Sequence, residues 1–488
     1  MRKKIKFGTD GWRAVIADDF TFENVKLVTI AIANYLLKNK LNKRGIVIGY
    51  DNRFLSEEFS KQAGYILSNR GFNVYLIKET APTPAVAFLV RELNLNGAIM
   101  ITASHNPPEY NGIKFIPYYG GPAEDKITDA IENNLDILLE HKENEIIDFK
   151  AAEIEKFKKN FKYISDLDSY KKKILEAIDK DLIKKSKPKV AADTMYGAGS
   201  KVLPELLKDN LEIDAKIFNN HRDPLFGGML PDPSEKNLKI LKSKVLENNF
   251  DLGVALDGDA DRFGVIDGKG VFINPNNVIS LILYYLIKKR KFKPDDIVVR
   301  TVATTHLIDE ICKKNNIKLL ETPVGFKYIS REMLNNNVII GGEESGGLSI
   351  KGHIPEKDGI LADLLLIEIQ SFIKKNYSGM YLSDYLYKIY EEFGTFYNIR
   401  LDIKIPAGKK DDVLKFFFNQ KNKTVCGKKV KEIIDKDGVK LLLENKSWIL
   451  VRPSGTEPLI RCYIESINKN YFNIMQRFVK QSIKSLVN

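Results

Sequence analysis

The chain has 488 residues, of which 44% are hydrophobic and 10% aromatic, so it is too long for one core and too apolar to be disordered. Domains of roughly 100–200 residues predict three or four of them. Lys and Arg outnumber Asp and Glu by 76 to 64, a net charge of +12, but the two signs interleave along the chain, which favours a solvated surface and small anionic substrates over nucleic acid.

The N-terminal stretch MRKKIKFGTDGW is basic but has no apolar segment after it, so no secretory signal peptide is expected. The Gly-rich segment at residues 7–21 carries Arg13. A structural ion pair and a role in a functional site explain this arginine equally well. The three cysteines are scattered and lack metal-ligand spacing, which is typical of a reducing cytoplasm. The longest apolar stretch, 278–287, is too short to span a bilayer and predicts a buried helix. We expect a cytoplasmic protein that does not enter membranes.

Three segments share one layout: residues 44–77, 189–218 and 295–323. Each runs from a β-branched apolar stretch through an amphipathic stretch to a second apolar run, which predicts strand–helix–strand units in three similar α/β domains. From about residue 381 the pattern predicts a smaller α+β domain with an antiparallel sheet. The predicted domains are 1–150, 151–270, 271–380 and 381–488, and the charged stretch 139–160 is expected to be a solvated helix and linker.

A strand predicted at residues 98–101 runs into a loop that holds Ser104, His105 and the pair Pro107 and Pro108. Ser, Asn, Pro and Gly are common where strands end, so this stretch alone is explained by an ordinary turn. The alternative is that the loop presents Ser104 for a function, and it depends on the rest of the chain.

Asp257, Asp259 and Asp261 follow an apolar strand predicted within residues 251–267. In an extended backbone this spacing puts the three carboxylates on one side, where they repel unless a cation lies among them. Such hard oxygen ligands suit Mg²⁺ or Ca²⁺. An EF-hand is excluded, because Arg262 and Gly268 occupy the places of its Gly and Glu. An Asp-rich turn without a metal is the simpler alternative.

Two later strands also end in loops with ligand-binding potential. Residues 338–350 place Glu343, Glu344 and Ser345 in a Gly-rich loop, where carboxylate and hydroxyl groups could bind sugar hydroxyls, although a solvated turn would look the same. Residues 449–465 combine an arginine, two hydroxyls and backbone N–H groups in one turn, which suits an oxyanion. The side chains and glycine concerned are Arg452, Ser454, Gly455, Thr456 and, on the following strand, Arg461.

Together these stretches resemble the α-D-phosphohexomutase family, which includes phosphoglucomutase and phosphomannomutase. TASHNPPEYNGIK (102–114) is similar to the family's phosphoserine loop, DGDADR (257–262) to its Mg²⁺ loop, GEESGG (342–347) to its sugar-recognition loop and RPSGTEP (452–458) to its phosphate-binding loop; FGTDGWR (7–13) and HRDPLFGGMLPDP (221–233) also fit. The resemblance spans nearly the whole chain in the family's order. It implies three similar α/β domains, with mixed sheets sandwiched by helices, and a smaller C-terminal α+β domain around a central active-site cleft.

The resemblance implies an intramolecular phosphotransferase in which phospho-Ser104 donates its phosphoryl group to a hexose 1-phosphate. A bisphosphorylated sugar, of the glucose 1,6-bisphosphate type, is the implied intermediate or activator. One Mg²⁺ per chain is implied at Ser104, Asp257, Asp259 and Asp261. Lys114 and Arg13 are implied in proton handling and charge stabilisation. His105 is implied in positioning or phosphate contact without a Ser-His dyad, because neighbours on an extended chain point apart. The implied substrate contacts are Arg262, Lys327, Glu343, Ser345, Arg452, Ser454, Gly455, Thr456 and Arg461.

Phe326 and Lys327 stand where many bacterial dual-specificity members of the family carry a histidine, and with the GEES sequence they favour glucose phosphates. Phosphomannomutase and phosphoglucosamine mutase are alternatives of the same class. A phosphatase, in which water takes the phosphoryl group from Ser104, and a non-catalytic sugar-phosphate-binding protein are alternatives of other classes. The expected partners are small sugar phosphates, not nucleic acid, and the expected state is a monomer or a homodimer.

Overall fold

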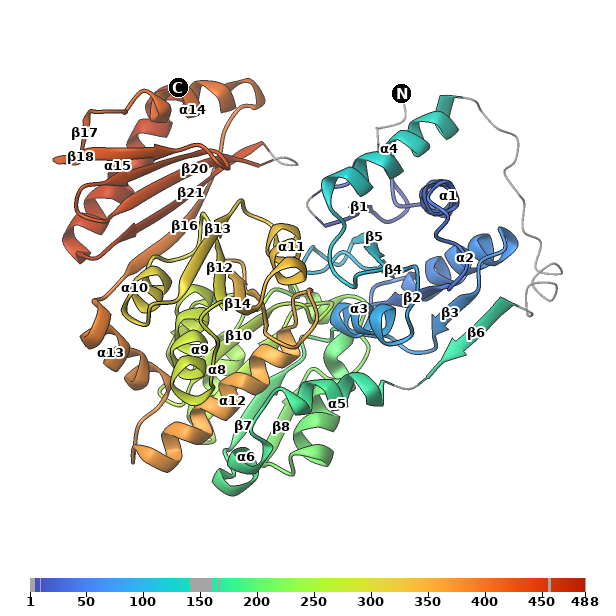
Figure 1. Cartoon of the computed structure of the whole chain (residues 1–488), viewed down its shortest axis with the longest axis horizontal. Coiled ribbons are helices and arrows are strands. Elements are labelled where there is room, and N and C mark those ends of the chain that lie inside the picture. The colour runs from blue at the N-terminus through green and yellow to red at the C-terminus, as the bar shows by residue number, and fades with distance from the viewer. Residues whose placement is uncertain (1–4, 9, 141–159, 166, 455–457, 488) are drawn as a thin grey trace.

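The computed structural model describes residues 5–8, 10–140, 160–165, 167–454 and 458–487. It contains three α/β units followed by a C-terminal α+β unit, which confirms the predicted fold class. Figure 1 shows the first unit (blue) and the C-terminal unit (red) on opposite sides, with the third (yellow) and second (green) units between and below them. Most of the charged stretch 139–160 lies outside the described residues. Among the described helices, none combines the length and the apolar character that crossing a membrane requires.

The first unit is built on a six-stranded sheet with the order β1-β5-β4-β2-β3-β6. Alternate residues of the central strand β2 enter different cores, because Ile46 and Ile48 pack with α1 and α2 while Val47 packs in the core that contains α3. Strand β6 pairs with β3, so this sheet continues beyond residue 150. The elements are β1 (Trp12–Val15), α1 (Phe22–Lys38), β2 (Ile46–Tyr50), α2 (Ser56–Asn69), β3 (Val74–Ile77), α3 (Thr83–Glu92), β4 (Gly97–Ile101), β5 (Tyr110–Pro117), α4 (Asp125–Glu140) and β6 (Phe161–Ile164).

The second unit has a five-stranded sheet with the order β11-β10-β9-β7-β8. The amphipathic helix expected between β7 and β8 is instead broken into a 3-10 turn at Ala198–Ser200, a short α7 and a π-helical segment at Glu205–Asn210. Pro204 lies at the junction and has no N–H for a helical hydrogen bond. The elements are α5 (Asp168–Glu176), α6 (Lys180–Ser186), β7 (Val190–Asp193), α7 (Val202–Pro204), β8 (Ala215–Phe218), α8 (Lys239–Glu247), β9 (Leu252–Leu256), β10 (Phe263–Asp267) and β11 (Phe272–Ile273).

The third unit has a four-stranded sheet with the order β13-β12-β14-β15. Helix α9 is buried over residues 278–286, as its apolar sequence predicts. The elements are α9 (Pro275–Lys289), β12 (Ile297–Thr301), α10 (Leu307–Lys314), β13 (Lys318–Thr322), α11 (Phe326–Asn335), β14 (Val338–Glu343), β15 (Gly347–Ile350), α12 (Gly359–Asn376) and α13 (Leu382–Phe393).

The three α/β units share one strand arrangement. The orders β5-β4-β2-β3, β10-β9-β7-β8 and β15-β14-β12-β13 are equivalent, with parallel central pairs and an antiparallel fourth strand in each. Three of the loops singled out in the sequence connect equivalent strands. The loop at 102–109 joins β4 to β5, the loop at 257–262 joins β9 to β10, and the loop at 344–346 joins β14 to β15. The repeat therefore places three candidate loops at equivalent positions, which the sequence pattern did not reveal.

The C-terminal unit has a six-stranded antiparallel sheet with the order β16-β21-β20-β19-β18-β17. Helices α14 and α15 cover one face, and Trp448, Leu450 and Tyr463 on the other face pack against Val302 and Ala303 of the third unit. Strand β20 ends at Pro453 and β21 begins at Leu459, and residues 455–457 between them lie outside the described part of the chain. The elements are β16 (Tyr397–Lys404), α14 (Lys410–Phe418), β17 (Thr424–Val425), β18 (Lys428–Ile434), β19 (Val439–Leu443), β20 (Trp448–Pro453), β21 (Leu459–Ser466) and α15 (Lys469–Val487).

Helix α12 contains a buried acid. Asp363 is 0% exposed, and neither of its carboxylate oxygens has a hydrogen-bond partner in the part of the chain that the structure describes. Burial, with a smaller contribution from Asp358, raises the pKa of Asp363 well above its usual range. The folded state therefore favours the neutral acid.

We expect Asp363→Leu to raise the thermal unfolding midpoint. The unfolded chain ionises Asp363 near pH 4, and the folded chain does so only at higher pH, so the aspartate lowers stability progressively as pH rises above about 4. The gain from Asp363→Leu should thus be larger at pH 8 than at pH 4.5, by differential scanning calorimetry. Asp129→Leu, at an exposed position of α4, is the control. A gain that does not change with pH would contradict the neutral-acid assignment.

Candidate active site

Ser104 lies in the loop 102–109 between β4 and β5. It is 1% exposed and has a left-handed backbone, with φ of 52°. Its Oγ donates to Asp257 Oδ2 at 2.9 Å and lies 3.3 Å from His105 Nδ1. The expectation that Ser104 and His105 point apart is wrong, because it assumed an extended chain and the left-handed turn brings the two side chains together. Burial, with Arg262 and Arg13 nearby, lowers the pKa of His105 well below its usual range, so the imidazole is neutral.

Arg53 holds this loop in place, although no pattern in the sequence pointed to it. The side chain is fully buried, and its two terminal nitrogens donate to four backbone carbonyls of the loop and its end, at Ser104 (2.6 Å), Asn106 (2.6 Å), Pro107 (2.7 Å) and Tyr110 (2.9 Å). A planar guanidinium with five donors can satisfy so many acceptors, whereas an ammonium has only three.

Asp51 completes the support beneath the serine. Its carboxylate lies 3.2 Å from Arg53 Nε and accepts from Thr102 Oγ1 at 2.6 Å. The Thr102 hydroxyl in turn accepts from the Ser104 backbone N–H at 2.8 Å. Asp51 and Arg53 follow β2, so the central parallel strand of the first unit fixes the loop that leaves its neighbour β4.

Asp257, Asp259 and Asp261 are all buried, and one oxygen of each lies within 4.8 Å of the others. This confirms that the three carboxylates converge, but the reason differs from the expected one. The loop is a turn with Ala260 in the left-handed region, not an extended strand. Burial, Asp261 and Asp259 raise the pKa of Asp257 well above its usual range, which is the electrostatic cost that a bound cation would remove.

The same residues fit a magnesium ion. Asp259 Oδ1 and Asp261 Oδ1 are buried and have no hydrogen-bond partner among the described residues, so these hard oxygen atoms are available as ligands. Ser104 Oγ, 2.9 Å from Asp257 Oδ2, is next to the cluster. A phosphorylated serine there would add a further oxygen ligand.

Lys114 lies on β5 and joins three acids. Its Nζ is 2.8 Å from Asp10 Oδ2, 2.9 Å from Asp259 Oδ2 and 3.1 Å from Asp261 Oδ2. Although burial acts in the opposite direction, these carboxylates raise the pKa of Lys114 above its usual range, so it is a cation at neutral pH. Arg13 Nη1 donates to Asn106 Oδ1 at 2.8 Å, which ties β1 to the Ser104 loop.

Lys357 and Glu356 bring the third unit into the cluster and were not predicted. Lys357 Nζ lies 3.4 Å from Asp261 Oδ2, 3.6 Å from Asp10 Oδ2 and 3.3 Å from Glu356 Oε1. Burial raises the pKa of Glu356 to about 7, although Lys357 acts to lower it. The adjacent Glu, Lys and Asp at 356–358 are the one local signal that could have drawn attention to this segment. Arg262, which was predicted, lies beside Asp261, with 3.9 Å between Nε and Oδ1.

Of the predicted sugar-binding residues, Glu343 and Ser345 lie together, whereas Lys327 is engaged elsewhere. Glu343 is 6% exposed and accepts from Ser345 Oγ at 2.7 Å, so these two groups lie together. Burial raises the pKa of Glu343, although Lys357 acts to lower it. Lys327, however, forms an ion pair with Asp125 of the first unit and is thus engaged at the contact between α11 and α4. The structure does not bring it to the aspartate cluster.

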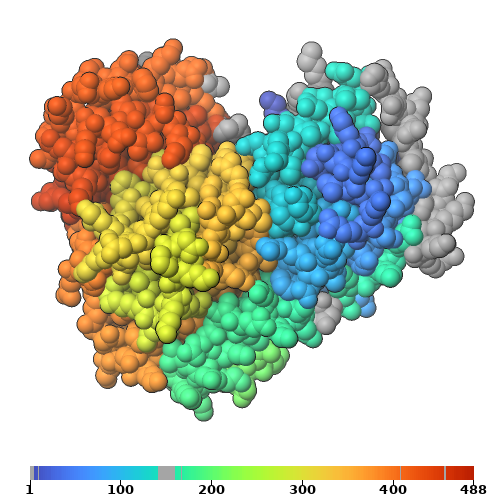
Figure 2. Space-filling view, in the orientation of Figure 1, coloured from blue at the N-terminus to red at the C-terminus, as the bar shows by residue number. Residues whose placement is uncertain are grey.

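Of the predicted phosphate-binding residues, Arg452, Ser454 and Arg461 lie at or next to the adjoining ends of β20 and β21. Arg452 and Arg461 are directly opposite each other in the ladder, and Arg452 Nη2 lies 3.0 Å from Asp437 Oδ2. The buried Ser454 accepts at its backbone carbonyl from Lys410 Nζ at 2.6 Å. Gly455 and Thr456 lie outside the described residues. Figure 2 shows the surface notched between the C-terminal and first units.

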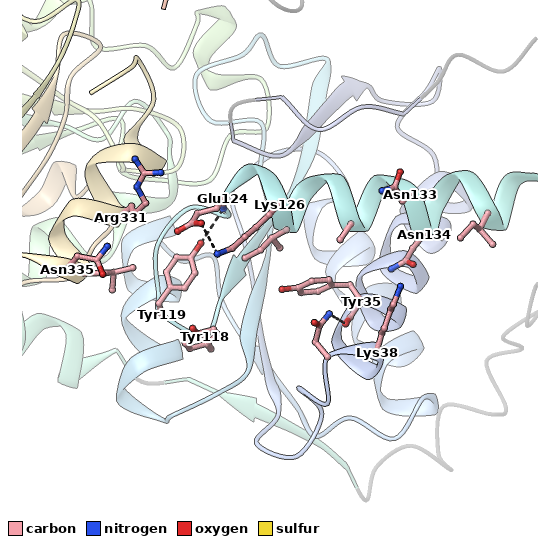
Figure 3. A pocket seen from close by; sticks show the side chains of 15 residues that line it. Tyr35, Lys38, Tyr118, Tyr119, Glu124, Lys126, Asn133, Asn134, Arg331 and Asn335 are labelled. Carbon is pink, nitrogen blue, oxygen red and sulfur yellow. Dashed lines mark hydrogen bonds and ion pairs between the residues drawn. The ribbon is translucent and has the colours of Figure 1, made fainter. Parts of the chain in front are cut away.

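A separate hollow of about 700 Å³ lies where α1, α4 and α11 meet. Figure 3 shows its lining, in which Tyr35, Tyr119 and Lys126 come from the first unit and Arg331 from the third. None of the residues predicted for the site lines it, so this hollow and the candidate chemistry are at different places.

The chain matches four domain families along its length. They are the phosphoglucomutase/phosphomannomutase α/β/α domain I (residues 4–141), domain II (168–270), domain III (274–393) and C-terminal domain (408–470). It is 32% identical to a phosphoglucomutase/phosphomannomutase of Thermococcus kodakarensis, over 98% of this chain and 99% of that protein. It is 31% identical to a phosphoglucosamine mutase of Finegoldia magna, over 95% of each.

Solved structures agree with these matches. The crystal structure of a putative phosphomannomutase from Thermus thermophilus superposes with a TM-score of 0.83, at 31% identity, over 99% of this chain and 100% of that one. These relatives align with this chain over nearly its whole length, but their names refer to different sugars: glucose, mannose and glucosamine.

Arg53→Lys should loosen the Ser104 loop. The lysine keeps the charge but cannot reach four carbonyls, and leaving a buried acceptor unpaired costs about 1–3 kcal/mol. We expect hydrogen exchange of residues 102–110, measured by mass spectrometry, to be about tenfold faster or more. Arg70→Lys, which affects a hydrogen bond to Asn34 elsewhere in the same unit, is the control. Unchanged protection of the loop would show that Arg53 does not organise it.

Mg²⁺ should bind at the aspartate cluster. We expect millimolar Mg²⁺ to raise the thermal midpoint of the parent protein, because an ion that binds only the folded state stabilises it. Asp259→Asn and Asp261→Asn should remove most of that shift. Asp214→Asn, at an exposed position of the second unit, should keep it. A full shift in Asp261→Asn would place the ion elsewhere.

Proposed function

Since the chain belongs to the phosphoglucomutase/phosphomannomutase family of phosphohexomutases, we propose that it interconverts hexose 1-phosphate and hexose 6-phosphate through a phosphoserine at Ser104, with glucose phosphate as its preferred substrate. The observation that carries the proposal is the distance of 2.9 Å between Ser104 Oγ and Asp257 Oδ2. It puts a buried serine beside three carboxylates suited to a cation, on a loop that Arg53 makes rigid.

In the proposed reaction, the phosphorus–oxygen bond at Ser104 breaks while one forms to the free hydroxyl oxygen of the sugar. The hydroxyl proton ends on Ser104 Oγ, so the exchange is balanced. After the bisphosphate has turned over in the site, its other phosphoryl group passes to Ser104 Oγ, and the serine proton ends on the sugar oxygen that this group leaves. Asp257, Asp259, Asp261 and phospho-Ser104 would hold Mg²⁺, which neutralises charge on the transferring group. Because Lys114 is a cation, we assign it to donating a proton or hydrogen bond to the reacting oxygens, with Arg13 stabilising the negative charge.

The rest of the proposal concerns the sugar. Glu343 and Ser345 would bind ring hydroxyls, while Arg262, Arg452, Ser454, Gly455, Thr456 and Arg461 would bind the phosphates. A second phosphate grip favours a mutase over a phosphatase, because the bisphosphate must be held in two orientations. Lys327 is paired with Asp125, so a contact with the sugar would use another of its N–H donors or follow a change at the α4–α11 contact. Mannose and glucosamine phosphates are the alternatives that the names of the relatives support.

Ser104→Ala should reduce conversion of glucose 1-phosphate to glucose 6-phosphate at least about a thousandfold, because the covalent carrier is lost. Ser243→Ala, on the exposed side of α8, is the control. Coupled assays of the parent with glucose, mannose and glucosamine 1-phosphates should give the highest kcat/KM for glucose. An active Ser104→Ala variant would reject the mechanism. Release of inorganic phosphate instead of hexose 6-phosphate would indicate a phosphatase. A higher kcat/KM for mannose or glucosamine 1-phosphate would replace glucose phosphate as the proposed substrate.

A further inference from the structure

The turn at residues 435–438, between β18 and β19, is packed against Arg452. Gly438 has φ of 87°, and a Cβ added there would lie 2.4 Å from the Val451 carbonyl oxygen and 2.7 Å from Arg452 Cβ. Contacts that short cannot be relieved by side-chain movement, because they involve the strand itself. The turn is therefore fitted to the end of β20 at the place where Arg452 leaves the sheet.

Asp437 in this turn binds two partners through one oxygen. Its Oδ2 accepts from the Val324 backbone N–H at 2.9 Å and lies 3.0 Å from Arg452 Nη2. Both side chains of the ion pair are largely buried, at 21% and 16% exposure. The carboxylate thus fixes one corner of the guanidinium relative to the backbone of a different unit.

One donor of the Arg452 guanidinium, next to the nitrogen that Asp437 holds, is available. Arg452 Nε is buried and has no hydrogen-bond partner among the residues that the structure describes. Because the guanidinium is planar, holding Nη2 also fixes the direction of Nε–H. Arg461 lies directly across the ladder from Arg452, so a second guanidinium flanks the same place. Two adjacent cations, one of which has an Nε–H donor that is unpaired among the described residues, form a suitable contact for a phosphate group.

The same turn ties the C-terminal unit to the third unit. Val324 lies in the short connection between β13 and α11, two residues before Phe326. Lys436, beside Asp437, donates to the Glu321 carbonyl oxygen at 2.8 Å. The turn therefore has two links to the third unit, of which only Asp437 also contacts Arg452.

We propose that Asp437 is a positioning residue for the phosphate that is not being transferred: it orients Arg452 and sets its distance from the third unit, so that Arg452 Nε meets the phosphate of the bound sugar. The inference rests on the proposed mutase function. We assign Asp437 no direct contact with the phosphate, because both groups are negatively charged and Asp437 Oδ2 is already shared between Arg452 and Val324.

The test is steady-state kinetics of Asp437→Asn in both directions, with glucose 1-phosphate and glucose 6-phosphate and saturating Mg²⁺. Asparagine can still accept from the Val324 N–H but loses the charge that holds Arg452. We expect KM to rise about tenfold for both sugars, with kcat within about twofold of the parent, because a charge-assisted hydrogen bond at a binding group is lost. Phosphorylation of Ser104 in the purified protein, measured by peptide mass spectrometry, should be unchanged.

Two matched variants distinguish the orientation of Arg452 from the docking of the two units and from the loss of a negative charge in the turn. Lys436→Met removes the neighbouring link to the third unit, and Asp435→Asn makes the same charge change at an exposed site of the same turn; both should keep the parent KM. An equal rise in KM for Lys436→Met would show that the turn only docks two units, and an unchanged KM for Asp437→Asn would show that Arg452 needs no orientation. Either result overturns the inference in an active parent, whereas an inactive parent would instead reject the proposed function.

Discussion

Buried carboxylates of the second unit are neutralised by lysines of the first and third units, and this pairing governs how the three units assemble. Isolated charges are costly to bury, and a buried group left without its partner costs more than the pair contributes. Lys114 from the first unit reaches Asp259 and Asp261 of the second, and Lys357 from the third reaches Asp261. Thr83 of the first unit adds a 2.6 Å hydrogen bond to Asp259. The same ion pairs and hydrogen bond therefore both join the three units and form the candidate site.

The serine loop adds a second constraint, which is local. A left-handed backbone at a residue other than glycine costs about 1–2 kcal/mol and persists only where the surroundings enforce it. At Ser104 they do, because Arg53 binds the loop carbonyls and Asp51 acts through Thr102 on the Ser104 N–H. Gly258 allows close approach from the second unit, since a Cβ there would lie 2.5 Å from the Ser104 carbonyl oxygen. The hydroxyl is therefore held toward Asp257 before any ligand arrives.

The sequence predicted the parts of this arrangement that are contiguous along the chain. The three strand–helix–strand units and the antiparallel C-terminal sheet follow from local periodicity. The convergence of the aspartates was also predicted, but a turn at Ala260 produces it and not the extended spacing that the prediction assumed. Arg53, Asp10 and Lys357 were missed because each acts across a tertiary contact. The run of charged residues at 356–358 was the only local signal for Lys357, and it does not show which partners the lysine has. The Ser104–His105 geometry was predicted wrongly because one left-handed residue reverses the direction of a side chain. Pairing of Lys327 with Asp125 depends on how two units meet, which no local pattern encodes.

The central claim is that Ser104 passes its phosphoryl group to a sugar in a site built by three units. The most direct measurement is the fate of that group in a single turnover. Protein carrying ³²P on Ser104 would be mixed with excess unlabelled glucose 1-phosphate and Mg²⁺, and quenched at short times. The account predicts that the label leaves the serine and appears in glucose 1,6-bisphosphate and then in glucose 6-phosphate. Label that stays on the protein while product forms, or that appears only as inorganic phosphate, would contradict it.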